Sequence, residues 1–191
     1  YKRQGRSIAI PNPIFFFAQE RDLAEEAYPG DIIGVPNHGT MRVGDTLTEG
    51  EALRFTGIPS FAPEILRRAR VDDAMRAKQM RRALEDLAEE GVTQVFRPVL
   101  GSGWIVGVVG PLQLDVLRSR ITAEYSVEID FEDAGFDSAR WLSAADRQEI
   151  ERFTARHREA VAEDRDGAPV FLARSRWELD RVIRDWPEIQ F

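Results

Sequence analysis

Between residues 90 and 131, apolar residues follow the spacing of strands, then that of a helix, and then that of a strand again. Residues 92–98 and 104–109 are rich in β-branched and aromatic side chains, and a Gly-Ser-Gly turn separates them. After Gly110-Pro111, leucine and isoleucine recur at helical intervals, and residues 125–131 return to a strand pattern. The pattern predicts a β-β-α-β unit. Its almost wholly apolar second strand is expected at the centre of a sheet, with both faces covered.

A longer helix is predicted upstream, over about residues 73–90. Its apolar positions share one face and are Ala77, Met80, Leu84, Leu87 and Ala88. Asp72 or Asp73 is expected to cap its start, and Gly91 to end it. Residues 63–70, which begin with Pro63, are expected to form a short helical turn.

The C-terminal third alternates strands and helices. Strands are predicted at residues 138–142, 160–162 and 170–173. One helix is predicted to start at Ser143 and to run to about His157. Ser175 and Glu178 form a capping-box pattern for a last helix, which ends before Pro187. The apolar contacts expected from that helix are Trp177, Val182, Ile183 and Trp186.

The first 55 residues read as short β-like runs separated by turns. Residues 7–10 and 14–18 are expected to be extended, and residues 32–35 and 41–43 to pair as a hairpin. These runs predict part of a small β-barrel, whose missing strands would leave unpaired edges. The predicted fold class is α+β: a partial β-barrel at residues 1–56 and an α/β domain at residues 57–191, joined by a connector rich in Pro and Gly.

Composition narrows the chemistry. The chain has a net charge of −7 and no cysteine, which excludes disulfides and thiolate metal sites and suits a reducing cytoplasm. Its two histidines lie far apart in sequence, which disfavours a zinc site. No apolar run approaches the length of a membrane span, and the start resembles neither a signal peptide nor a transit peptide. Because residue 1 is a tyrosine, the chain is expected to begin within a longer protein.

Sequence motifs for nucleotide binding and for nucleophilic catalysis are missing from the chain. A P-loop needs Gly-Lys followed by Ser or Thr, yet Lys2 and Lys78 follow Tyr1 and Ala77. A dinucleotide fingerprint and a nucleophile elbow are also missing. Carboxylate pairs such as Asp72-Asp73 are expected at helix ends as solvated charge. No catalytic, cofactor or metal residue is therefore predicted, and an enzyme with a cryptic carboxylate site is the alternative.

Positive charge is concentrated between residues 67 and 82. Seven basic residues lie there: Arg67, Arg68, Arg70, Arg76, Lys78, Arg81 and Arg82. Only Asp72 and Asp73 oppose them within this stretch. In an acidic chain, such contrast favours contact with a polyanion such as RNA. The alternative is a solvated helix face that pairs with the acidic residues at 85, 86 and 89. His38 is expected in a turn and is a weaker candidate for a contact.

Several short, separated segments of the sequence resemble segments of one protein family. They are Tyr28-Pro29-Gly30-Asp31-Ile32-Ile33-Gly34, Asn37-His38-Gly39-Thr40, Phe55-Thr56-Gly57-Ile58-Pro59, Gln94-Val95-Phe96-Arg97-Pro98, Gly110-Pro111-Leu112-Gln113-Leu114-Asp115 and Glu124-Tyr125-Ser126-Val127-Glu128. In this order they resemble the C-terminal region of bacterial peptide chain release factor 3, from about residue 27 to residue 191. The phrase at 110–115 also resembles the start of a helix in domain III of elongation factor G. By this resemblance, residues 1–56 correspond to the end of a domain II barrel and residues 57–191 to domain III.

The resemblance implies a function without catalysis in this segment. Members of the family are cytoplasmic, ribosome-bound GTPases that promote the departure of class I release factors during translation termination. GTP or GDP and Mg would be bound by an N-terminal domain preceding residue 1. The implied partners are small-subunit ribosomal RNA and protein, class I release factors and that GTP-binding domain, with neither DNA nor a membrane. The alternative is a fragment of elongation factor G or of a ribosome-protection protein. Only about sixty residues follow the β-β-α-β unit, too few for the further domains of elongation factor G.

Overall fold

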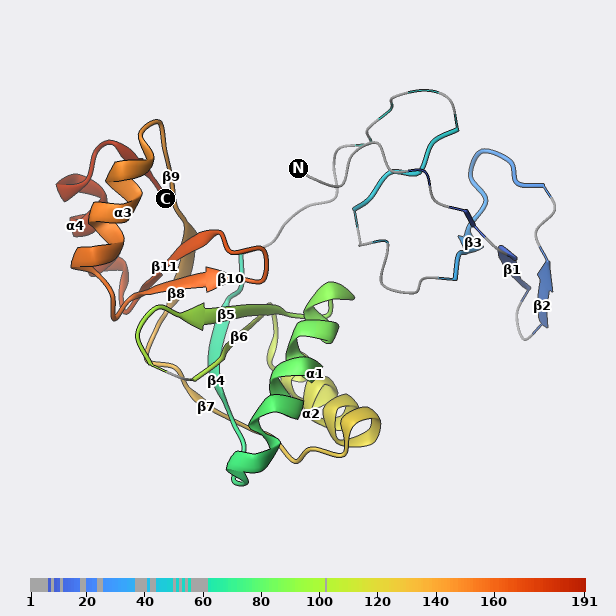
Figure 1. Ribbon diagram of the computed structural model, residues 1–191, viewed down its shortest axis with the longest axis horizontal. Coiled ribbons are helices and arrows are strands. Elements are labelled where there is room, and N and C mark those ends of the chain that lie inside the picture. The colour runs from blue at the N-terminus through green and yellow to red at the C-terminus, as the bar shows by residue number, and fades with distance from the viewer. Residues whose placement is uncertain are drawn as a thin grey trace. The chain divides into compact units, whose positions relative to one another are not determined.

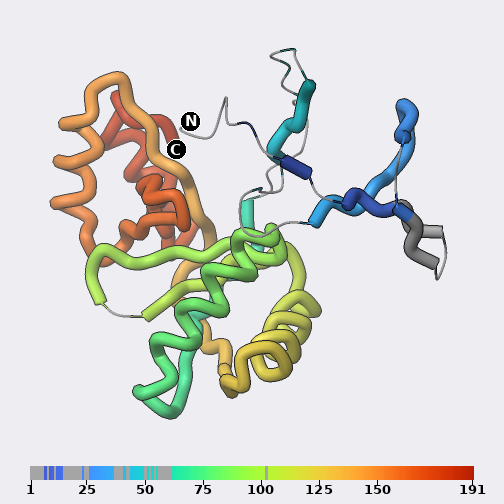
Figure 2. The backbone as a smooth tube through the Cα atoms, turned by 45° about the vertical axis from the view of Figure 1, so that its right-hand side comes forward, coloured from blue at the N-terminus to red at the C-terminus, as the bar shows by residue number. Residues whose placement is uncertain are grey.

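The computed structural model describes residues 7, 9–10, 12–17, 20–23, 26–36, 41, 44–49, 51, 53, 55, 62–101 and 103–191. The chain divides into two compact units, Tyr1–Leu47 and Thr48–Phe191, and each is described by itself (Figures 1 and 2). The predicted α+β fold class is confirmed. In the described part of the chain, no helix has the length and apolar character needed to cross a membrane.

The first unit contains a three-stranded antiparallel sheet in the order β2-β1-β3. Its strands are β1 (Ile14–Phe17), β2 (Glu20–Leu23) and β3 (Ile33–Gly34). The strand expected at 14–18 is thus confirmed over Ile14–Phe17, residue 18 lying outside the described residues, whereas the described residues of 7–10 form none. β3 pairs with β1, and the expected hairpin across residues 37–40, including His38, lies largely outside the described residues.

The second unit is built on a seven-stranded sheet in which every neighbouring pair is antiparallel, in the order β7-β4-β6-β5-β10-β11-β8. The strands are β4 (Ile65–Arg70), β5 (Gln94–Pro98), β6 (Ile105–Val108), β7 (Asp130–Asp133), β8 (Ser138–Trp141), β10 (Val161–Asp164) and β11 (Pro169–Ala173). The helical elements are the 3-10 turn η1 (Ala74–Arg76) and the helices α1 (Ala77–Glu89), α2 (Pro111–Tyr125), α3 (Arg147–Arg156) and α4 (Arg176–Asp185). A separate pair joins β9 (Ser143–Ala144) to β12 (Ile189–Gln190).

The predicted β-β-α-β unit is confirmed as β5, β6, α2 and β7. β6 lies inside the sheet and all four of its residues are buried, as its apolar sequence predicts. The third strand starts later than predicted, because α2 continues to Tyr125 and Ser126 ends it in a left-handed conformation with φ of 53°. β7 therefore begins at Asp130.

The prediction of a helical turn over residues 63–70 is wrong. Residues Ile65–Arg70 form strand β4, which pairs with β6 on one side and β7 on the other. The arginines at adjacent positions hide the alternation that normally marks a strand. Pro63 is buried against Gly107, where an added Cβ would lie 2.8 Å from the Pro63 Cβ. The chain is thus held extended by pairing and packing that only the folded sheet supplies.

Helices α1 and α2 cover one face of the sheet and are seen together in Figure 1. The predicted apolar stripe of α1 is largely correct, since Met80, Leu84, Leu87 and Ala88 are buried. Ala77 is exposed, and Ala83 is buried instead. The Asp73 side chain accepts a hydrogen bond from the Met75 N–H at 2.9 Å, so it caps η1, which leads into α1.

Helices α3 and α4 pack with the C-terminal strands. α3 begins three residues later than predicted, because Asp146 caps it and Ser143 belongs to β9. The predicted cap of α4 is confirmed: the Glu178 N–H donates to the Ser175 Oγ at 3.1 Å. Two of its predicted apolar contacts are wrong, since Trp177 is 67% and Ile183 42% exposed.

Candidate nucleic-acid interface

The seven basic residues predicted to bind a polyanion come from three elements. Arg67, Arg68 and Arg70 lie on β4, Arg76 ends η1, and Lys78, Arg81 and Arg82 lie on α1. Side chains of adjacent strand residues point to opposite faces, which separates Arg67 from Arg68. The set is therefore spread over the unit. His38, the remaining candidate, lies outside the described residues.

On β4, the arginines pair with carboxylates of the neighbouring strand β7. The Arg70 Nη1 lies 2.6 Å from the Glu132 Oε1, and the hydrogen bond to this carboxylate raises the pKa of Arg70. The Arg67 Nη1 lies 3.6 Å from the Asp133 Oδ1. These carboxylates are more than 60 residues away in sequence. Counting the charged residues between positions 67 and 82 therefore leaves them out.

On η1 and α1, three further arginines have acidic partners nearby. Arg81 lies 3.0 Å from Glu85, and Arg82 lies 3.7 Å from Asp86. Arg81 also stands over the Trp104 ring at 5.8 Å. Arg76 lies 3.9 Å from Asp73. Intrahelical pairs of this kind match the alternative of a solvated helix face.

Arg68 and Lys78 are the members of the set without an ion pair among the described residues. Arg68 crosses the turn between β5 and β6, where a Cβ added to Gly103 would lie 2.8 Å from its Nη1. Lys78 is exposed at the start of α1. Most of the positive charge counted in the sequence is thus already balanced within the fold.

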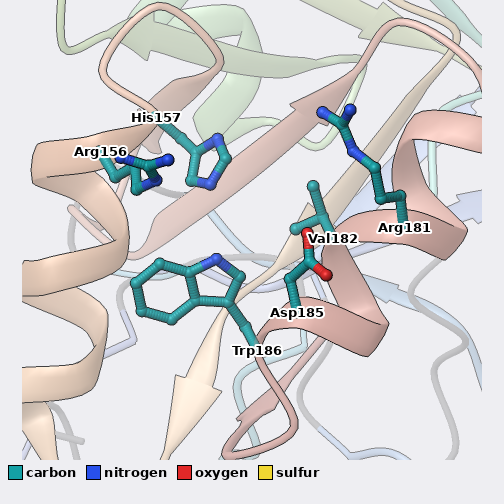
Figure 3. A pocket seen from close by; sticks show the side chains of 6 residues that line it. All are labelled: Arg156, His157, Arg181, Val182, Asp185 and Trp186. Atoms are coloured by element: carbon teal, nitrogen blue, oxygen red, sulfur yellow. The ribbon is translucent and has the colours of Figure 1, made fainter.

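A second basic surface lies between α3 and α4 (Figure 3). It is a pocket of about 460 Å³ lined by Arg156, His157, Arg181, Val182, Asp185 and Trp186. Arg156 and His157 come from the end of α3, and the other residues come from α4 and its C-terminal cap. We call it the α3–α4 pocket.

The α3–α4 pocket carries more positive than negative charge. Neither Arg156 nor Arg181 has an ion pair with a described residue, and Asp185 is the one carboxylate in the lining. The His157 ring stacks on Phe153 with 4.5 Å between ring centroids, and its Nε2 is buried without a hydrogen-bond partner in the described structure. Burial, followed by the charge of Arg156, lowers the pKa of His157.

An aromatic cluster packs against two residues of the pocket, His157 and Trp186. Phe153 is fully buried, and its ring meets Phe171 at 5.4 Å, Trp186 at 5.2 Å and Phe191 at 5.5 Å, all edge to face. Edge-to-face contacts are a favoured arrangement for aromatic rings. The wall formed by His157 and Trp186 is therefore held by a packed core.

The exposed face of α4 extends the pocket. Trp177 is 67% exposed, and the Arg181 guanidinium carbon stands 5.1 Å from the centre of its ring. An arginine stacked on an indole face is a cation–π contact. Sequence reasoning missed this surface because it assigned Trp177 and Trp186 to the core. The available signal was the four-residue spacing of Trp177 and Arg181, which places both on one helix face.

The other shifted ionisable groups connect α1 to α2. The Tyr125 hydroxyl donates to Asp86 at 2.9 Å, and burial with this bond raises the pKa of Tyr125 to about 12. Arg120 binds Glu124 and Glu90, and these hydrogen bonds raise the pKa of Arg120 and lower that of Glu124. Among the described residues no group of three or more His, Cys, Asp or Glu is placed to hold a metal ion.

Comparison with known proteins matches two family models in tandem. Residues 55–183 match the C-terminal domain of class II release factor RF3. Residues 2–50 match elongation factor G domain 2. A crystal structure of a protein from Thermus thermophilus is similar in fold, with a TM-score of 0.51 and 21% sequence identity. That similarity covers 65% of this chain but 19% of the Thermus protein, so this chain spans a small part of the solved protein.

Proposed function

Since the chain belongs to the class II release factor RF3 family of translation factors, we propose that it is the part of a termination GTPase that contacts the ribosome and helps class I release factors to leave it. The observation that carries this proposal is the order of the two matches. A domain 2 of elongation factor G type precedes a release factor C-terminal domain within one chain. Taken alone, the domain 2 match would also fit the alternative of a fragment of elongation factor G or of a ribosome-protection protein.

The proposed role is positioning and coupling rather than catalysis. The 191 residues contain no Gly-Lys-Ser/Thr phosphate loop, so GTP and Mg are proposed to bind a domain outside this segment. The seven-stranded sheet, with α1 and α2 joined by the hydrogen bond between Tyr125 and Asp86, is proposed to move as one body. A rigid body transmits a displacement from one domain to another without absorbing it.

Ribosomal contact is proposed to involve phosphate groups. Arg68 and Lys78 are the members of the predicted basic set best able to bind phosphate without first giving up a carboxylate. The ion-paired members, Arg67, Arg70, Arg76, Arg81 and Arg82, would have to exchange a carboxylate for phosphate. His38 stays a candidate on sequence grounds. Each phosphate contact adds to the salt dependence of binding.

Cosedimentation with small ribosomal subunits tests the contact. We expect the 191-residue chain to pellet with the subunits at low salt and to be released as salt rises. The double variant Arg68→Glu, Lys78→Glu should weaken pelleting. The matched control Arg147→Glu, Arg152→Glu, on α3, should not. If the unmodified chain did not pellet with the subunits at any of the salt concentrations, the proposed function would be refuted.

A competition assay tests the role in termination. Complete release factor 3 and GTP accelerate the departure of a fluorescent class I release factor from termination complexes. Excess 191-residue chain should slow that departure by occupying the same ribosomal site. The Leu84→Asp variant, which places a charge in the core, is the control for non-specific effects. Binding to ribosomes without any slowing would place the chain at another site and contradict the proposal.

A further inference from the structure

We propose that the α3–α4 pocket and the exposed Trp177 beside it bind an unpaired RNA nucleotide, with the base on the aromatic face and the phosphate between Arg156 and Arg181. This inference rests on the proposed function, because it supplies the residues of a ribosomal RNA contact. It differs from the basic segment of β4, η1 and α1 in its location and its chemistry.

The first observation is the charge that the fold leaves available. Ion pairs within the described residues occupy Arg67, Arg70, Arg76, Arg81 and Arg82. In contrast, Arg156 and Arg181 face the pocket without such a partner among the described residues. A guanidinium without a carboxylate can bind phosphate with two parallel hydrogen bonds and loses no existing pair in doing so.

The second observation is the exposed aromatic surface. A tryptophan that is 67% exposed buries little apolar area, so it adds little to folding. The Arg181 guanidinium, which lines the pocket, stands over one face of this ring. Proteins that hold single-stranded RNA combine such aromatic platforms with arginine.

The third observation is the shape and polarity of the pocket. In Figure 3, the His157 ring lies between the Arg156 and Arg181 side chains, and the Trp186 ring lies below them in the view. The volume of about 460 Å³ is in the range of sites for small molecules and admits one nucleotide, but not a paired helix. These features favour an unstacked nucleotide over a protein surface.

Fluorescence anisotropy with a labelled single-stranded RNA of mixed sequence, about 12 nucleotides long to cover one binding site, tests the proposal on the 191-residue chain. Trp177→Ala should weaken binding about five- to 100-fold, the usual loss for a stacked base. Arg156→Ala and Arg181→Ala should each lower the salt dependence by about one unit of the logarithmic slope. The matched control Arg184→Ala, on the same helix but outside the pocket, should bind like the unmodified chain. All four side chains are exposed, so circular dichroism should show unchanged folding.

The outcomes separate the alternatives. Equal binding of the RNA by the unmodified chain and the three pocket variants would overturn the proposal. So would equally tight binding of free uridine monophosphate, which would indicate a soluble nucleotide as ligand. Pocket variants that still bind the RNA but no longer pellet with small ribosomal subunits would indicate that the pocket binds a protein. That result would also overturn the proposal. If the unmodified chain pellets with small subunits and the pocket variants pellet equally well, this inference fails while the proposed function stands. If the unmodified chain does not pellet, the proposed function fails, and the RNA measurement alone decides the site.

Discussion

Replacing Phe153 by alanine removes the ring on which the C-terminal aromatic cluster is assembled. The Phe153 side chain is fully buried, and its ring meets four other rings within 5.5 Å between centroids. Two of these partners, His157 and Trp186, line the α3–α4 pocket. The substitution therefore tests both the stability of the second unit and the support of the proposed RNA site.

The magnitude follows from burial and ring contacts. Truncating a buried phenylalanine to alanine typically costs about 3–5 kcal/mol of unfolding free energy. For a unit of this size, that loss corresponds to a fall in melting temperature of about 6–20 °C. Phe153→Leu keeps most of the apolar volume but loses the ring pairs, which contribute about 0.5–1.5 kcal/mol each. It should lie between the unmodified chain and Phe153→Ala.

Urea unfolding followed by tryptophan fluorescence measures these losses. The control is Trp177→Ala, which removes a larger ring from an exposed position and should change stability by less than about 1 kcal/mol. If Phe153→Ala and Trp177→Ala were equally stable, the aromatic cluster would not be a core. His157 and Trp186 would then be held in place by other contacts.

Three further expectations concern α1, α2 and the end of α3. Leu84→Asp should prevent folding of the second unit, seen as loss of near-ultraviolet circular dichroism, because it buries a charge at a fully buried position; a cooperative native-like transition would contradict this. Tyr125 should lose its proton near pH 12 in a titration followed by ultraviolet absorbance. The folded chain keeps that proton after the unfolded chain has lost it, so stability should fall as pH rises above about 10, and Tyr125→Phe should abolish the late step. The lowered pKa of His157 makes stability depend on pH in the opposite direction from Tyr125. As pH falls, the unfolded chain takes up the proton before the folded chain does, so stability should fall as pH drops below about 6.5. His157→Gln should show a shallower loss of melting temperature between about pH 7 and pH 5, and an identical slope would contradict the burial argument.

Elements that depend on neighbouring residues could be predicted from the sequence. The apolar stripe of α1, the all-apolar strand β6 and the serine cap of α4 are local patterns, and the structure confirms them except for Ala77 in the stripe. The family assignment likewise followed from ordered phrases of residues, and the match over residues 55–183 confirms it. Periodicity and capping act over a few residues, which is why one sequence suffices to find them.

Elements that depend on distant residues could not be predicted in the same way. Residues Ile65–Arg70 form a strand because β6 and β7 offer pairing on both sides, and the sequence of β4 alone does not reveal this. The same pairing brings Glu132 to Arg70 and Asp133 to Arg67. These carboxylates balance two positive charges that had no partner in the count of residues 67–82.

The sequence by itself determined the class of fold, the family and the individual helices and most strands of the second unit. The tertiary structure decided which arginines are paired with a carboxylate and which have no ion pair among the described residues. It also brought the end of α3 beside α4, which created the α3–α4 pocket from residues about thirty positions apart. The physical reason is that apolar spacing is written along the chain, whereas charge pairing and pocket walls depend on distances in space that only the packed core fixes.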